Sequence, residues 1–258
     1  MYPYNIIGNI SLYEIFLALG VVAAIIVFRI VADKLKIGAR LFNFTLICAL
    51  CAIAAGLGFS VLFQALYNIG PRGEFVIDKN TGATFAGGLI GGAATFIAVY
   101  FIFGKKADEN YKIEFKRIAD CAACAIPAGH AIGRIGCLMD GCCYGRKTES
   151  FIGIHMQNLG YKVVPTQLFE AIFLALLTAT LVYFLIKRSI PAMSVYLICY
   201  GVWRFVIEFF RDDYRGTSLV PFLTPSQLIA IMMVICGAAL IILRFRDVRK
   251  KAAENENA

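Results

Sequence analysis

The stretch Thr224–Leu243, with the sequence TPSQLIAIMMVICGAALIIL, contains no charged side chain. About 20 mostly apolar residues in a helix are enough to cross a hydrocarbon layer about 30 Å thick. Six similar stretches precede it in the chain. The seven lie at Ser11–Val31, Leu41–Leu66, Phe85–Phe103, Ile118–Met139, Thr166–Ile186, Ala192–Phe210 and Thr224–Leu243. This pattern predicts an all-α integral membrane protein with about seven transmembrane helices joined by short loops and two longer outward-facing loops.

The composition supports the same class. Of the 258 residues, 60% are hydrophobic and only 16% are charged, which is too apolar for a soluble domain with a surface in water. No internal repeat, low-complexity linker or soluble segment interrupts the apolar pattern. We therefore expect residues 1–258 to form a single polytopic membrane domain.

The formal net charge of +8 does not indicate nucleic-acid binding, because the basic residues lie in short loops. Cytoplasmic loops of membrane proteins carry an excess of Lys and Arg. With the N-terminus outside, fifteen basic residues fall on the inner side and seven on the outer side. We predict that the N-terminus is outside and the C-terminus cytoplasmic. The first residues lack the basic segment of a cleavable signal peptide, so we expect the first apolar run to remain a membrane helix.

The fourth apolar stretch is interrupted by polar residues and by Pro127. His130 and Arg134 are four residues apart and therefore share one face of a helix. A guanidinium at membrane depth needs an anionic partner, and a lipid phosphate is the most abundant anion there. Arg134 is thus a candidate phosphate ligand. His130 is either a structural hydrogen-bonding residue or a base.

The sixth stretch repeats this spacing, since Tyr200, Arg204 and Glu208 follow one another at intervals of four. Two interpretations remain open for Arg204: an ion pair with Glu208 that joins helices, or an arginine kept for an anionic ligand. The third stretch begins FAGGLIGG at Phe85. Its glycines allow either close helix packing or the close approach of a lipid headgroup.

The nine cysteines do not indicate a disulfide framework, because most lie in apolar stretches. Cys48, Cys51, Cys199 and Cys236 are expected to be small buried packing residues. The two CxxC pairs lie at membrane depth and His is scarce, so they predict no zinc site. Three further cysteines lie among polar residues at the end of the fourth stretch, followed by a loop whose FIGIHM segment predicts a short hairpin or a lid on the outer surface.

Four sequence blocks in this order resemble the prolipoprotein diacylglyceryl transferase family. They are FAGGLIG at Phe85–Gly91, GRIGCLMDGCCYG at Gly133–Gly145, PTQLFE at Pro165–Glu170 and YGVWRFVIEFFR at Tyr200–Arg211. The resemblance implies an enzyme of the bacterial cytoplasmic membrane with a central lipid-binding cavity. It also implies transfer of the diacylglyceryl group of phosphatidylglycerol to the lipobox cysteine of an exported preprotein, with no cofactor, no metal and no nucleic acid.

Carried over by position, the resemblance implies that Arg134, Tyr200 and Arg204 are functional, and we add His130 from its place beside Arg134. The residues expected to bind lipid or substrate are Gly87, Gly88, Cys137, Asp140, Cys142, Gly145, Glu170, Glu208 and Arg211. The chain also departs from the family. Ala86 replaces a His that the family uses, and Cys137 and Cys142 replace an Asn and a Glu.

Three routes around the missing His remain open. His130 can accept the thiol proton, the arginines alone can favour a substrate thiolate, or Cys142 or Cys143 can carry the lipid covalently. A non-enzymatic alternative is a lipid- or preprotein-binding membrane protein. A transporter is disfavoured, because the sequence has no matching pair of interrupted helices.

Overall fold

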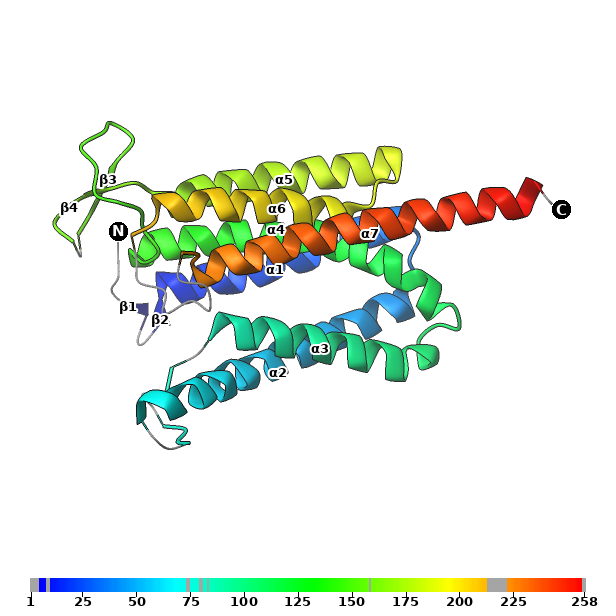
Figure 1. Cartoon of the computed structure of the whole chain (residues 1–258), viewed down its shortest axis with the longest axis horizontal. Helices are drawn as coiled ribbons and strands as arrows, with labels where there is room; N and C mark the ends of the chain where they lie inside the picture. The colour runs from blue at the N-terminus through cyan, green and yellow to red at the C-terminus, as the bar shows by residue number, and fades with distance from the viewer. Residues whose placement is uncertain are drawn as a thin grey trace. The chain divides into compact units, whose positions relative to one another are not determined.

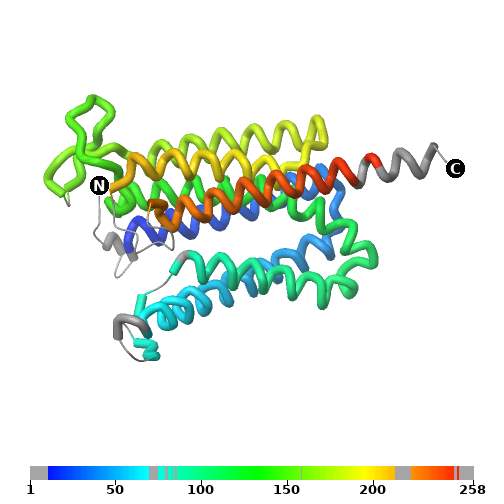
Figure 2. The backbone as a smooth tube through the Cα atoms, viewed as in Figure 1, coloured from blue at the N-terminus to red at the C-terminus, as the bar shows by residue number. Residues whose placement is uncertain are grey.

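The computed structural model describes residues 5–7, 10–72, 75–78, 81–82, 84–157, 159–212 and 222–256 (Figure 2). The chain divides into two compact units. One comprises Met1–Lys34 with Ala119–Ala258, and the other Leu35–Ile118. The expectation of a single domain stays a prediction.

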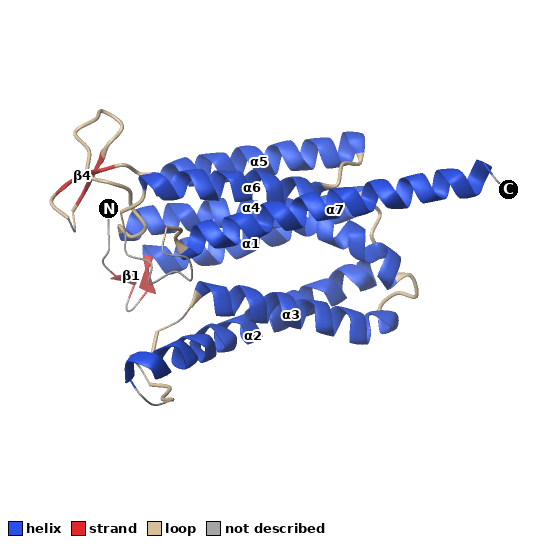
Figure 3. Ribbon diagram, viewed as in Figure 1, coloured by secondary structure: helices blue, strands red, loops and turns tan. Residues whose placement is uncertain are grey.

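The described residues contain seven helices that are long and apolar enough to cross a membrane, which confirms the predicted fold class (Figures 1 and 3). They are α1 Leu12–Lys34, α2 Ala39–Arg72, α3 Phe85–Phe103, α4 Tyr111–Asp140, α5 Thr166–Arg188, α6 Ala192–Ile207 and α7 Pro225–Glu256. Short 3-10 helices follow α3 (η1, Gly104–Lys106) and α6 (η2, Glu208–Phe210). Several helices extend beyond the apolar stretches, because hydropathy marks only the part of a helix that lies at membrane depth.

Helix α4 continues through its polar and proline-containing middle. Pro127 lies inside the helix and is buried. Membrane helices tolerate such a proline, because neighbouring helices and local adjustments satisfy the backbone groups that it frees. The helix therefore carries His130 and Arg134 in the register that the sequence predicts.

In the first unit, helices approach closely at glycines. An ideal Cβ on Gly20 of α1 would lie 2.7 Å from the carbonyl oxygen of Gly129 on α4, and the reverse distance is also 2.7 Å. An ideal Cβ on Gly201 of α6 would lie 2.9 Å from the carbonyl oxygen of Ala230 on α7. Small residues of this kind let membrane helices pack backbone against backbone.

The second unit is built around the contact between α2 and α3. An ideal Cβ on Gly87 would lie 2.6 Å from Cβ of Phe63 and 2.7 Å from the carbonyl oxygen of Phe59. An ideal Cβ on Gly88 would lie 3.4 Å from the carbonyl oxygen of Gly56, which is ordinary van der Waals contact. The glycines of the FAGGLIGG block therefore serve helix packing in this unit.

The segment after α4 forms the predicted hairpin. Strand β3 (Ile154–Met156) pairs antiparallel with β4 (Tyr161–Val163), while β1 (Asn5–Ile7) pairs with β2 (Ile10–Ser11). Met156 and Val163 are fully buried and pack with Leu138 of α4, whereas His155 is exposed. The hairpin is thus anchored to the end of α4.

The expectation that the cysteines within the spans are packing residues is only partly confirmed. Cys48 is buried and Cys199 is partly exposed, but Cys51 and Cys236 are exposed. The expectation is wrong for these two because the outer surface of a membrane helix faces lipid, where a small apolar thiol needs no protein neighbours.

Candidate active site

The carboxylate of Glu170 lies where helices α4, α5 and α6 meet. Its side chain is fully buried in the first turns of α5. Oε1 accepts a 3.0 Å hydrogen bond from Nη2 of Arg134 on α4 and a 2.8 Å hydrogen bond from the hydroxyl group of Tyr200 on α6. A buried charge at membrane depth is tolerated when it is paired in this way.

Two more arginines face the other oxygen of the same carboxylate. Nη1 of Arg204 lies 3.8 Å from Oε2 of Glu170, and Nη1 of Arg211 lies 4.0 Å from it. Arg134 and Arg204 therefore converge on one anion from different helices, and in this structure that anion is a protein carboxylate. Sequence reasoning grouped Glu170 with the binding residues and missed its central position.

Arg204 also forms an ion pair with Glu208, the first residue of η2, which is one of the two interpretations that the sequence leaves open. Its Nη2 lies 2.9 Å from Oε2 of Glu208, and the two residues are four positions apart in the chain. The same Nη2 donates a 2.8 Å hydrogen bond to Oγ of Ser226, and Oε1 of Glu208 accepts a 3.0 Å hydrogen bond from Thr224. Arg204 is thus held by several partners.

The start of α7 places Thr224 and Ser226 beside this pair. The side chain of Gln227 accepts a hydrogen bond from the backbone N–H of Thr224, whose hydroxyl oxygen accepts one from the N–H of Gln227. This reciprocal arrangement is a capping box, with Pro225 at the first helical position. The sequence TPSQ is its signature, so this part of the site could have been found from the sequence.

His130 is the most accessible polar side chain beside the carboxylate. Its side chain is 31% exposed, compared with 11% for Arg134 and 8% for Arg204. Nε2 of His130 lies 4.0 Å from Oε1 of Glu170, and the ring meets that of Tyr200 edge to face with 5.4 Å between centroids. A molecule arriving from outside the protein can therefore reach His130 more easily than the buried carboxylate.

Arg134 retains hydrogen-bonding capacity. Its Nε is buried and has no hydrogen-bond partner among the described residues. A buried N–H without a partner is costly, so this donor favours a ligand with acceptor oxygens.

The glycine at the end of the signature has a packing role. An ideal Cβ on Gly145 would lie 2.6 Å from the carbonyl oxygen of Phe210 and 2.8 Å from that of Val164. Gly145 also forms an isolated antiparallel bridge with Arg211. Its missing side chain lets the loop after α4 lie against the segment that carries Arg211.

The three cysteines of the signature gather beside the site. The sequence places Cys137 and Cys142 among the expected binding residues, but it did not lead us to expect that three thiols lie together. Cys137 lies three residues after Arg134. The Sγ atoms of Cys137, Cys142 and Cys143 all lie within 4.8 Å of one another. Hydrogen bonds with the other two thiols, together with the nearby guanidinium of Arg211, lower the pKa of Cys143. Asp140 ends α4 close by and is partly exposed.

The sequence of the chain matches one protein family over almost its whole length. The sequence profile of the family described as prolipoprotein diacylglyceryl transferase matches residues 4–243. The chain belongs to this family. It is 32% identical over 243 residues to a phosphatidylglycerol–prolipoprotein diacylglyceryl transferase of Clostridium tetani, covering 91% of this chain and 93% of that relative.

Two further relatives carry similar names. A phosphatidylglycerol–prolipoprotein diacylglyceryl transferase 2 of Clostridium perfringens is 30% identical over 256 residues, with 94% of each chain covered. The transferase of Ehrlichia ruminantium (strain Welgevonden) is 34% identical over 199 residues, covering 72% of this chain and 74% of the relative. The family assignment thus rests on relatives from distinct bacterial genera.

In this diacylglyceryl transferase family member, most of the predicted site residues lie together. The first unit contains His130, Arg134, Cys137, Asp140, Cys142, Gly145, Glu170, Tyr200, Arg204, Glu208 and Arg211. Gly87 and Gly88 belong to the second unit, where Ala86 is exposed on α3.

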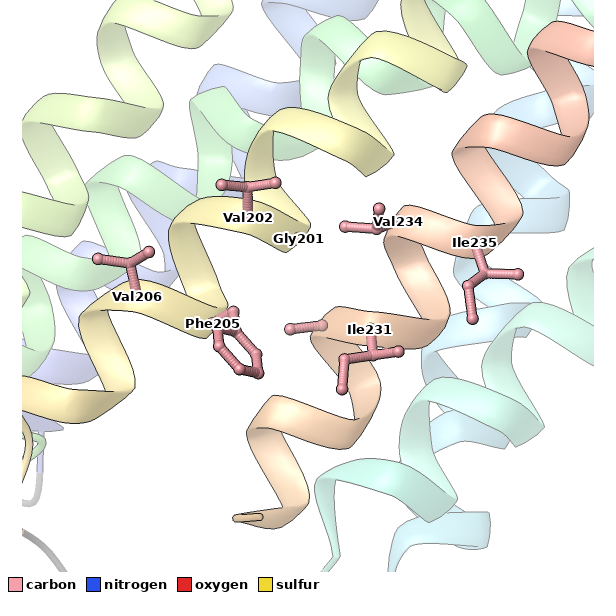
Figure 4. Close-up of a pocket in the computed structure, with 8 residues that line it drawn as sticks. Gly201, Val202, Phe205, Val206, Ile231, Val234 and Ile235 are labelled. Carbon is pink, nitrogen blue, oxygen red and sulfur yellow. The ribbon is translucent and has the colours of Figure 1, made fainter. Parts of the chain in front are cut away.

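Two apolar grooves flank the polar side chains of the transferase. One, of about 300 Å³, lies between α6 and α7 and includes Gly201, Phe205 and Ile231 (Figure 4). The other, of about 290 Å³, lies between α4 and α5 and includes Ala131 and Ala171, the residues next to His130 and Glu170. The first unit thus offers apolar grooves along its helices, and a central lipid-binding cavity stays a prediction.

Proposed function

We propose that the side chains around Glu170 form the active site at which this transferase moves the diacylglyceryl group of phosphatidylglycerol to a prolipoprotein. The observation that carries this proposal is the convergence of Arg134 and Arg204, from α4 and α6, on a single anion. Arginine pairs with phosphate as it does with carboxylate, through parallel N–H···O bonds. The geometry that holds Glu170 therefore suits a phosphate placed beside the guanidinium group of Arg134, which is partly exposed.

Arg134 is the arginine best placed to bind the lipid phosphate. Its side chain is more exposed than that of Arg204, and its Nε is a buried donor without a hydrogen-bond partner among the described residues. Arg204 is held by Glu208 and Ser226 and contributes a fixed positive charge close by. The leaving group of the reaction gains negative charge, and fixed cations in a dry site stabilise it.

The reaction exchanges one bond to carbon for another. The sulfur of a prolipoprotein cysteine attacks the glyceryl carbon that bears the phosphate, and a C–S bond forms as the C–O bond breaks. Glycerol phosphate leaves with the bonding electron pair, and diacylglycerol remains on the sulfur as a thioether. The thiol proton goes to Nε2 of His130, which takes over the role of the His that Ala86 replaces.

Glu170 acts as a positioning residue in this scheme. Its buried carboxylate fixes Arg134 and Tyr200 through hydrogen bonds and lies 4.0 Å from Nε2 of His130. Once the imidazole accepts a proton, it faces a negative charge. At 4.0 Å the carboxylate stabilises the imidazolium through its charge and not through a hydrogen bond.

The groove between α6 and α7 is proposed to hold an acyl chain of the lipid. Its lining in Figure 4 is apolar throughout, and Gly201 and Phe205 directly follow Tyr200 and Arg204 in the chain. A lipid whose phosphate meets the arginines has its tails within reach of this groove. Phosphatidylglycerol with a photoreactive acyl chain should then crosslink to Phe205 or Ile231.

The site is proposed to open to the outer side of the bacterial cytoplasmic membrane. The excess of basic residues in the opposite loops supports this orientation, with the N-terminus outside and the C-terminus cytoplasmic. A lipobox cysteine of an exported preprotein meets the enzyme on that side. No nucleic acid and no cofactor takes part in this scheme.

The proposal is tested with purified protein, labelled phosphatidylglycerol and a lipobox peptide. We expect a thioether-linked peptide and an equal amount of glycerol phosphate, and an unchanged mass of the enzyme after incubation with lipid alone. A diacylglyceryl adduct on Cys142 or Cys143 would instead establish a covalent route through the enzyme. Full turnover by Arg134→Ala and His130→Ala variants would show that the reaction takes place elsewhere.

A further inference from the structure

The proposed reaction makes no use of three thiols that lie next to its site. Sγ atoms of Cys137, Cys142 and Cys143 all lie within 4.8 Å of one another, and each side chain is partly exposed. The reaction's nucleophile belongs to the prolipoprotein, so the enzyme needs no thiol of its own. The cluster therefore calls for a separate explanation.

The end of α4 brings the first two thiols together. The N–H of Cys142 donates a 3.1 Å hydrogen bond to the carbonyl oxygen of Cys137, and the N–H of Gly141 donates a 3.3 Å bond to that of Leu138. Gly141 has a positive φ of 76°. This pattern is a Schellman motif, in which the side chains at the positions of Cys137 and Cys142 touch. A contact that usually joins two hydrophobic residues here joins two thiols.

The third thiol is added by an unusual backbone conformation. Cys143 has a φ of 63°, in the left-handed region that side chains other than glycine seldom adopt. The surroundings hold the turn in place: buried Thr166 donates a 2.9 Å hydrogen bond to the carbonyl oxygen of Cys143, and buried Gln167 donates one to that of Cys142. The cluster is thus fixed by the first turn of α5.

We infer that Cys137, Cys142 and Cys143 form a binding site for one soft, thiophilic cation of the Cu(I) or Zn(II) class. Thiolate ligands select such ions, and metal–sulfur distances of about 2.3 Å place sulfurs about 4 Å apart around a trigonal ion. The three Sγ atoms, all within 4.8 Å of one another, lie close to that spacing. The two CxxC pairs for which the sequence predicts no zinc site lie within the spans and do not include these three cysteines.

The charges nearby fit bound thiolates. Arg211 lies beside Cys143, and Arg134 lies one helical turn before Cys137. These guanidinium groups offset the negative charge of three thiolates around a monovalent or divalent ion. A bound ion crosslinks the last turn of α4 to the loop after it, and so stabilises the helix end that carries Arg134.

The test uses the full-length protein, purified in detergent and reduced, and titrated with Cd²⁺ as a spectroscopic probe. We expect a thiolate-to-metal absorption band that saturates at one ion per chain, and a higher unfolding temperature for the loaded protein. Competition with Zn²⁺ and with Cu(I) then ranks the two natural candidates. Peptide mapping after alkylation should show that the metal protects the three cluster cysteines but not Cys51 or Cys236, which are exposed elsewhere.

Variants separate this site from other thiols. Cys143→Ser and Cys142→Ser should each weaken Cd²⁺ binding at least tenfold, whereas Cys236→Ser should leave the affinity unchanged. If a variant fails to fold, the protection pattern of the wild-type protein decides. The inference is overturned if the reduced wild-type protein binds no Cd²⁺ at micromolar concentration, or if Cys51 and Cys236 are protected as strongly as the cluster. Because each readout is independent of lipid transfer, failure here leaves the proposed active site unaffected.

Discussion

The hydroxyl group of Tyr200 on α6 donates a 2.8 Å hydrogen bond to Oε1 of Glu170 on α5. The same oxygen accepts the hydrogen bond of Arg134 on α4, so one carboxylate ties three membrane helices together. Hydrogen bonds to charged groups are stronger than those between neutral groups, and an unpaired buried charge is very costly. Glu170 therefore supports both the fold of the first unit and the geometry of the site.

Replacing Glu170 by Gln should destabilise the protein strongly. The substitution keeps the shape but removes the negative charge among Arg134, Arg204 and Arg211, and breaking a buried charge pair costs about 3–5 kcal/mol. Unfolding in detergent, followed by circular dichroism, measures this loss. Glu149→Gln, at an exposed loop position, is the matched control and should change stability by less than about 0.5 kcal/mol. Equal stability of the two variants would show that Glu170 does not hold the arginines.

His130, the partly exposed side chain beside Glu170, should act as the general base. Loss of a general base costs about 10²–10⁴-fold in rate, so His130→Ala should lower kcat by that factor. His155→Ala removes the chain's other His, which lies exposed on β3, and should retain wild-type kcat. Transfer of labelled lipid to a lipobox peptide measures both. A wild-type rate for His130→Ala would favour activation of the thiol by the arginines alone.

The membrane fold was predictable from the sequence because its signals are local. Apolar stretches identify the seven spans, and the alternating FIGIHM segment identifies the hairpin. The intervals of four between Tyr200, Arg204 and Glu208 put these side chains on one helix face, and the 2.9 Å ion pair between Arg204 and Glu208 confirms that register. Helical periodicity is enough for contacts within one helix.

Contacts between helices leave no such periodic signal. Glu170 is 36 residues from Arg134 and 30 from Tyr200, so nothing in the local sequence marks it as their common partner. The packing role of Gly145 likewise depends on Phe210, which is distant in sequence. The cysteine cluster is different: the glycine after Asp140 signals a Schellman turn, and that turn could have placed Cys142 against Cys137 in advance.

Gly145 should tolerate no side chain. A methyl group there would meet backbone carbonyl oxygens of Phe210 and Val164 at 2.6 and 2.8 Å, and overpacking of this kind costs about 1–3 kcal/mol. Gly145→Ala should lower the unfolding temperature in detergent. Gly133→Ala, a helical glycine with nothing within 4 Å of its ideal Cβ, should be neutral or stabilising. If both variants unfold alike, the close approach at Gly145 is not what stabilises this loop.

The orientation in the membrane should place the hairpin outside and the C-terminus in the cytoplasm. In intact cells, an impermeant thiol reagent should label a cysteine introduced at Ser150, which lies in the exposed loop before β3. A tag placed after Ala258 should be reached only after the membrane is permeabilised. Labelling of the tag in intact cells would reverse the predicted topology.

The central claim, that Arg134 binds the lipid phosphate, is tested most directly by the kinetics of Arg134→Lys with phosphatidylglycerol as the varied substrate. Lysine keeps the charge but loses the planar donor, so kcat/KM should fall about 10- to 100-fold, the equivalent of a lost charge-assisted hydrogen bond. Arg146→Lys, in the exposed loop, should retain the wild-type value. If Arg134→Lys keeps the wild-type kcat/KM, the phosphate does not bind at this arginine.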